Sequence, residues 1–69
     1  MKRHPVDSSM ASSVGHDTKS LVLEIEFRTG QIWQYHGVPA KVYREMISGS
    51  IGSYFQNNIK GFYSEYRIR

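Results

Sequence analysis

Apolar and polar residues alternate along the stretch from Leu21 to Pro39, on both sides of Thr29-Gly30, and this pattern constrains the fold more than any other feature. Alternation with a period of two is typical of strands that bury one face. A glycine-containing break between two such runs indicates an antiparallel hairpin. The sequence therefore predicts two neighbouring strands joined by a tight turn.

Two registers of this hairpin differ in which side chains share a face. A two-residue turn at Thr29-Gly30 would place Ile25 opposite Gln34 and mix the two faces. A three-residue loop over residues 28–30, with its glycine in the left-handed conformation of a bulged turn, keeps the apolar residues together. We expect this second register, which makes both aromatic residues of the second strand core residues. It pairs Leu23 with Tyr35, Ile25 with Trp33, Phe27 with Gln31, and Glu24 with Gln34.

The remaining residues predict an α+β domain. Residues 12–16 fit a short strand, which a turn at residues 17–20 returns into the hairpin. Ser50 is suited to cap a second helix, and residues 62–69 fit either a last strand or an ordered extended arm. The expected fold is an antiparallel β-meander with two short helices on one face and a final C-terminal strand. Two apolar groups recur at helical spacing: Val42, Tyr43, Met46 and Ile47, then Ile51, Tyr54, Phe55 and Ile59.

Length and composition indicate one small domain. The 69 residues contain no cysteine, so neither a disulfide framework nor a thiolate metal site stabilises the fold. Residues 1–11 are rich in serine and are expected to form a flexible tail, and residues 12–69 the domain. The longest aliphatic run, Leu21-Val22-Leu23, is much shorter than a membrane span. We therefore expect a cytoplasmic protein without a membrane partner.

The sequence argues against an enzyme. It lacks a nucleophile motif and a phosphate-binding loop with its lysine, and so small a chain can hardly build a deep cleft. His16, Asp17 and His36 are expected to be surface residues and not metal ligands. Glu24 and Glu26 are expected to be solvated carboxylates. No cofactor is predicted.

The net charge of +3 lies near the ends of the chain. Residues 17–56 carry four basic and four acidic side chains, whereas the residues after 56 carry three basic side chains and one acidic one. Cations interleaved with aromatic side chains are typical of single-stranded nucleic-acid binding. The residues expected to contact a nucleic-acid backbone are Arg44, Lys60, Tyr63, Arg67 and Arg69. Trp33 and Tyr35 could stack bases only if no helix covered their face of the sheet.

Several of these segments, in this order, resemble the KTSC domain, a module named for its occurrence at the C-terminus of some lysyl-tRNA synthetases. Trp33-Gln34-Tyr35 stands where the family has Tyr-x-Tyr, and His16 stands where an aromatic residue is expected. The resemblance implies a small module of bacterial or phage proteins, with RNA binding as its suggested activity. The other matching elements are Ser8-Ser9, Val14-Gly15-His16-Asp17, Leu23–Phe27 with Thr29-Gly30, Val38-Pro39, Tyr54-Phe55-Gln56, Ile59-Lys60 and Tyr63.

Together these observations predict a non-catalytic binding module. RNA or tRNA is the expected ligand, chiefly because of the resemblance. A protein partner or a homodimer is the alternative, since a meander has sheet edges that can accept another strand.

Overall fold

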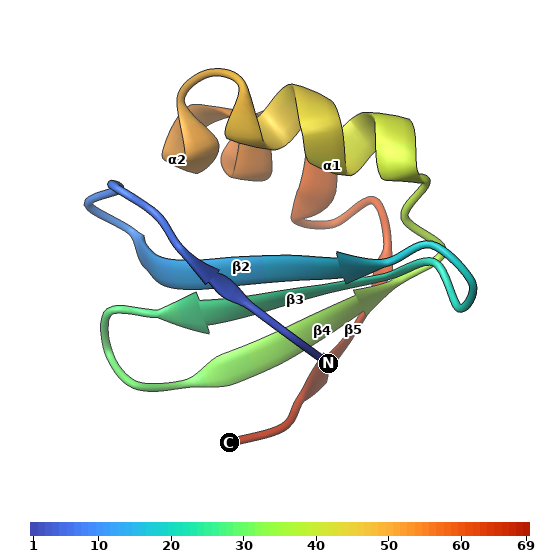
Figure 1. The fold of residues 1–69 in the computed structure, drawn as a ribbon, viewed down its shortest axis with the longest axis horizontal. Coiled ribbons are helices and arrows are strands. Elements are labelled where there is room, and N and C mark those ends of the chain that lie inside the picture. Colours follow the sequence, from blue (N-terminus) through green and yellow to red (C-terminus); the bar gives the residue numbers. More distant parts are fainter.

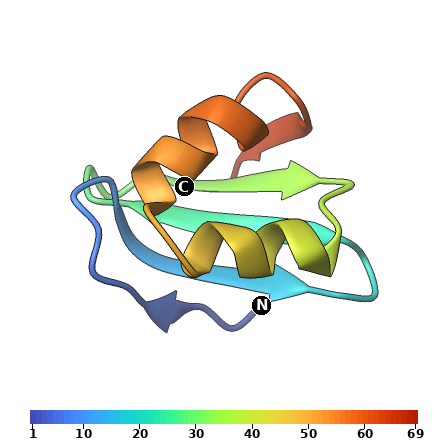
Figure 2. The same cartoon turned by 90° about the horizontal axis from the view of Figure 1, so that it is seen from above.

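The computed structural model describes residues 1–69 and has two layers, a five-stranded antiparallel sheet and a helical layer on one of its faces (Figures 1 and 2). The strands follow one another across the sheet in chain order. This arrangement confirms the predicted α+β fold and its final strand. The elements are β1 (His4–Pro5), β2 (Ala11–Asp17), β3 (Val22–Phe27), β4 (Ile32–His36), α1 (Ala40–Ile47), α2 (Ile51–Tyr54), the π-helical turn η1 (Phe55–Ile59) and β5 (Ser64–Arg67).

The hairpin of β3 and β4 has the predicted register. Leu23 pairs with Tyr35, Glu24 with Gln34, and Ile25 with Trp33. The Phe27 N–H donates to the Gln31 carbonyl at 2.8 Å, which closes the three-residue loop. Gly30 has a φ of +95°, a conformation that glycine adopts without the steric cost of a Cβ atom.

The inner face of the sheet, which is the face that the helices cover, carries the hydrophobic core. Phe55 of η1 meets two side chains of this face edge to face, with ring centroids 5.6 Å from Phe27 and 5.4 Å from Tyr35. Such aromatic pairs contribute about 0.5–1.5 kcal/mol each beyond the area they bury. The buried cluster consists of Ala11, Val14, Leu23, Ile25, Tyr35, Val38, Met46, Ile51, Phe55 and Ile59.

Both predicted helices are present. The Ser50 hydroxyl accepts a hydrogen bond from the Ser53 N–H at 3.3 Å and so caps α2, as expected. The face that α1 turns to the sheet is narrower than predicted, because Met46 is buried whereas Ile47 is 43% exposed. None of the helices has the length and hydrophobicity that crossing a membrane requires.

The first eleven residues, expected to be a tail outside the domain, supply the edge strand β1. His4 pairs with Val14 and Pro5 with Ser13. The packed part of the chain therefore begins before residue 12. This pairing joins segments about ten residues apart, and local alternation of a two-residue strand does not reveal it.

The segment before β1 crosses the outer face of the sheet, which is the face away from the helices. The Arg3 guanidinium bonds the Ser13 hydroxyl at 3.0 Å and forms an ion pair with Glu24, a carboxylate that is only 6% exposed. Gly15 lies beneath this segment, and a Cβ atom there would collide with the carbonyl oxygen of Lys2. The crossing therefore requires glycine at position 15.

Replacing Gly15 with alanine should displace the N-terminal segment from the outer face. We expect a loss of about 1–3 kcal/mol in the free energy of unfolding and faster tryptic cleavage after Arg3. Gly49→Ala is the matched control, because no atom lies within 4 Å of a Cβ atom built there, and its effect should stay within about 0.5 kcal/mol. Unchanged stability and cleavage in Gly15→Ala would contradict the packing described here.

Burial, together with the neighbouring Glu65 carboxylate, raises the pKa of Tyr35 to about 12. A tyrosine in the unfolded chain loses its proton near pH 10, so folding holds the proton that unfolding would release. The stability that depends on neutral Tyr35 is complete below pH 10 and is lost as the pH rises towards 12. When the pH is raised from 9 to 11.5, the free energy of unfolding measured with urea should fall by about 2 kcal/mol more in the native protein than in Tyr35→Phe. Equal decreases in the free energy of unfolding of the two proteins would show that the pKa of Tyr35 is not raised by folding.

Candidate functional site

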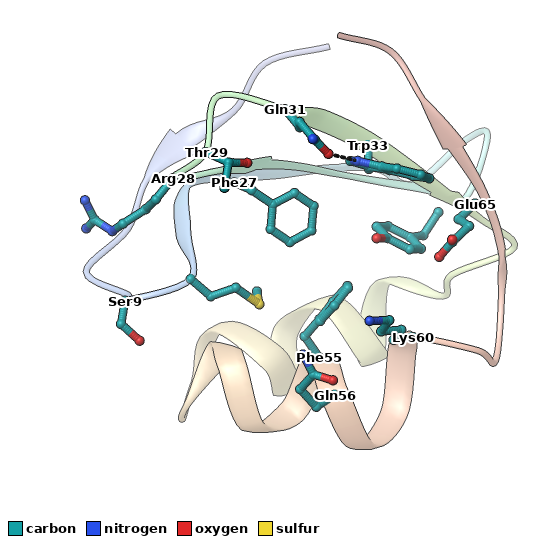
Figure 3. A pocket seen from close by; sticks show the side chains of 12 residues that line it. Ser9, Phe27, Arg28, Thr29, Gln31, Trp33, Phe55, Gln56, Lys60 and Glu65 are labelled. Carbon is teal, nitrogen blue, oxygen red and sulfur yellow. Dashed lines mark hydrogen bonds between the residues drawn. The ribbon is translucent and has the colours of Figure 1, made fainter.

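An open pocket of about 540 Å³ lies on the inner face, between the β3–β4 loop, β4, β5 and η1 (Figure 3). It is bounded by the sheet on one side and by η1 on the other, and aromatic side chains dominate its apolar lining. This is the only large hollow with a substantial apolar lining. The lining residues are Ser9, Met10, Phe27, Arg28, Thr29, Gln31, Trp33, Tyr35, Phe55, Gln56, Lys60 and Glu65.

Trp33 is partly buried and forms one wall of the pocket (Figure 3). Its indole Nε1–H donates to Gln31 Oε1 at 3.0 Å, which fixes the ring beside the pocket. The prediction that both aromatics of β4 are core residues is confirmed for Tyr35, which is 3% exposed. Trp33 packs against the same core but leaves part of its surface accessible, because the helical layer does not close over it.

Polar groups at the pocket are available to a ligand. The Tyr35 hydroxyl lines the pocket without a hydrogen-bond partner inside the protein, and it is not sealed from solvent. Lys60 and Glu65 lie at the same side of the pocket, from η1's end and from β5 (Figure 3). Arg28 is held at the other side, where its Nε–H donates to the Ser8 carbonyl at 2.6 Å. The site thus combines aromatic walls with donors, an acceptor and cations.

Of the five residues predicted to contact nucleic acid, one lines this pocket and a second is paired with one of the lining residues. Lys60 lines it directly. Arg67 pairs with Trp33 across β4 and β5, so that the two side chains share the inner face. Tyr63, the third predicted residue, is partly buried and packs against the core in the segment between η1 and β5.

The other two predicted residues lie elsewhere. Arg69 donates to Glu26 on the outer face at 3.4 Å. Its position follows from an irregular strand end, because the N–H groups of Ile68 and Arg69 both reach the Ile32 carbonyl and thereby break the alternation. Arg44 lies on α1, whose main contacts with the sheet are to β2. The five residues therefore do not form one surface.

The polar lining of the pocket was not predicted from the sequence. Gln31, Gln56 and Glu65 come from three separate segments, and only the fold brings them together. The hairpin register was the available signal, since it places Phe27, Trp33 and Tyr35 on one face. The hairpin register could not predict that η1 lies opposite these three side chains.

The residues considered as metal ligands have other partners. His16 stacks on Tyr43 and its Nε2 lies 2.6 Å from the Val38 carbonyl. Asp17 accepts hydrogen bonds from the Lys19 N–H and the Ser20 hydroxyl, which hold the pKa of its carboxyl below the ordinary value. His36 packs edge to face against Tyr66 on the outer face. No group of three histidine, cysteine or acidic side chains is arranged to hold a metal ion.

Known proteins that are similar to this chain include one with the same fold. An uncharacterized protein from Stutzerimonas stutzeri is 34% identical over 61 residues, which cover 87% of this chain and 86% of that protein. The crystal structure of a KTSC domain protein from Yersinia pestis superimposes with a TM-score of 0.95 at 38% identity, over 99% of this chain and 97% of the other. Residues 7–63 match the KTSC domain family. The chain therefore belongs to the KTSC domain family.

Proposed function

We propose that this protein is a non-catalytic module that binds a single-stranded segment of RNA at the inner-face pocket. The observation that carries the proposal is the juxtaposition of four aromatic side chains with Lys60 and Arg67. Bases stack on aromatic rings regardless of sequence, and cations beside the rings neutralise the phosphates. The aromatic side chains are Phe27, Trp33, Tyr35 and Phe55.

The size and polarity of the pocket suit one unpaired base. Its volume of about 540 Å³ falls within the range of small-molecule sites. Trp33 offers a ring for stacking, which is worth about 1–3 kcal/mol per base. The Tyr35 hydroxyl and the Glu65 carboxylate can then meet the edge of the base as donor and acceptor.

RNA is the favoured nucleic acid because the KTSC domain takes its name from its occurrence at the C-terminus of some lysyl-tRNA synthetases. Binding of cellular RNA by a bacterial or phage protein would take place in the cytoplasm. The module would raise the local concentration of RNA near a partner enzyme and would perform no chemistry itself. Few cations surround the pocket, so the affinity should be low and strongly dependent on salt.

Removing Lys60 of the pocket together with Arg67, the residue of β5 that pairs with Trp33, should weaken RNA binding more than removing two distant cations. In fluorescence anisotropy with a short labelled single-stranded RNA, Lys60→Ala/Arg67→Ala should bind at least about 10-fold more weakly at low salt. The slope of log affinity against log salt should also fall by about 1.4, since each phosphate contact contributes about 0.7.

Arg44→Ala/Arg69→Ala is the matched control, because it removes the same charge from α1 and from the outer face. Its affinity should change by no more than about 2-fold, as expected for distant charges that salt screens. Equal losses in the two double variants would show diffuse electrostatic binding without the pocket. Absence of binding by the native protein at low salt would refute the RNA proposal.

A further inference from the structure

The two edges of the sheet differ in how they are protected from a second strand. β1 has two residues, and one of them, Pro5, has no N–H to offer. β5 has four residues, all exposed, with β4 on one side and solvent on the other. It contains no proline, and its two charged residues, Glu65 and Arg67, have opposite signs and therefore do not repel a second copy of the same strand.

Large apolar side chains are exposed along and beside β5. Phe62 is 68% exposed, and Tyr66 and Ile68 are each 55% exposed. Exposed apolar side chains beside an open sheet edge favour a surface that another chain covers. Its position next to free backbone groups favours strand addition over side-chain docking alone.

The backbone of β5 presents two residues to the open edge. The Ile68 N–H donates to the Ile32 carbonyl at 2.7 Å, and residues 32 and 68 are opposite each other in the register of β4 and β5. Because hydrogen-bonded and non-hydrogen-bonded pairs alternate, Ser64 and Tyr66 also bond to β4. The N–H and C=O groups of Glu65 and Arg67 therefore point away from the sheet.

We propose that β5 pairs antiparallel with β5 of a second copy of this chain, with Tyr66 on the two-fold axis. This register places Glu65 opposite Arg67 of the second copy, and the reciprocal pair follows by symmetry. The outward backbone groups of these residues then form the hydrogen-bonded pairs that an antiparallel ladder needs. A register centred on Glu65 or on Arg67 would instead bring like charges together.

The pairing adds a cation to each pocket. Glu65 lines the pocket, so the facing Arg67 of the second copy lies beside the same rim and offsets a carboxylate that would repel phosphate. Both helical layers lie on one side of the joined sheet, because the two-fold axis is perpendicular to it. This consequence rests on the proposed RNA function, whereas the pairing itself does not.

Sedimentation equilibrium of the full chain without RNA, from micromolar to millimolar concentration, tests the pairing. Four residues bury little area, so we expect a weak dimer with a dissociation constant of roughly 10–500 µM. Glu65→Arg and Arg67→Glu should each weaken it at least about 10-fold, because both symmetric ion pairs become like-charge pairs. The double exchange Glu65→Arg/Arg67→Glu should restore the dissociation constant to within about 3-fold of the native value. Arg44→Glu, on α1, is the control and should leave it unchanged.

A monomer at all concentrations would overturn the proposal, and so would a double exchange that dimerises as weakly as the single variants. Circular dichroism melts of each variant identify any that fail to fold. Because no RNA is present, failure here leaves the RNA proposal standing, and failure of the RNA experiment leaves this one standing.

A second measurement uses the absence of cysteine from the chain. Tyr66→Cys should form a disulfide-linked dimer under mild oxidation, since the two residues face each other across the axis. Ser64→Cys is the control: it lies on the same face but about 13 Å from its copy in this register, beyond disulfide reach. Equal cross-linking of the two variants would exclude the register.

Discussion

Phe55 contacts both strands of the central hairpin and so packs η1 against the sheet. Its ring meets Phe27 and Tyr35 edge to face. Those two side chains point to the same side only because the loop at Gly30 gives the hairpin its register. The core beneath η1 and the pocket beside it are therefore two parts of one arrangement, in which Trp33 lies where the helical cover ends.

On the outer face, arginines near both ends of the chain bind carboxylates of β3. Glu24 of β3 binds Arg3 and accepts a hydrogen bond from the Gln34 amide at 2.8 Å, and Glu26 of the same strand binds Arg69. We expected both carboxylates to be merely solvated. Glu24 is instead largely buried and needs its partners, because a buried charge without them is costly. The exposed pair of Arg69 contributes less, since solvent screens it.

Local patterns were sufficient for most of the fold and insufficient for the site. Periodicity and the glycine of the loop predicted the register of β3 and β4, and the serine before α2 predicted its cap. The strand β1 was not predicted because two residues are too few to show an alternating pattern. The separation of Arg67 from Arg69 was missed because an irregular strand end turns Arg69 to the outer face. The pocket depends on where η1 lies above β4, which is a long-range contact that no short segment encodes.

If RNA binds at the pocket as proposed, a base lies against Trp33, and the chain's single tryptophan reports on this contact directly. Trp33 emission can be measured during titration with an unlabelled single-stranded RNA at low salt. If a base stacks on the indole, the emission should be quenched in a saturable way, with the same midpoint as anisotropy of a labelled RNA. Binding seen by anisotropy without any change in Trp33 emission would contradict the account, because the RNA would then lie away from the pocket.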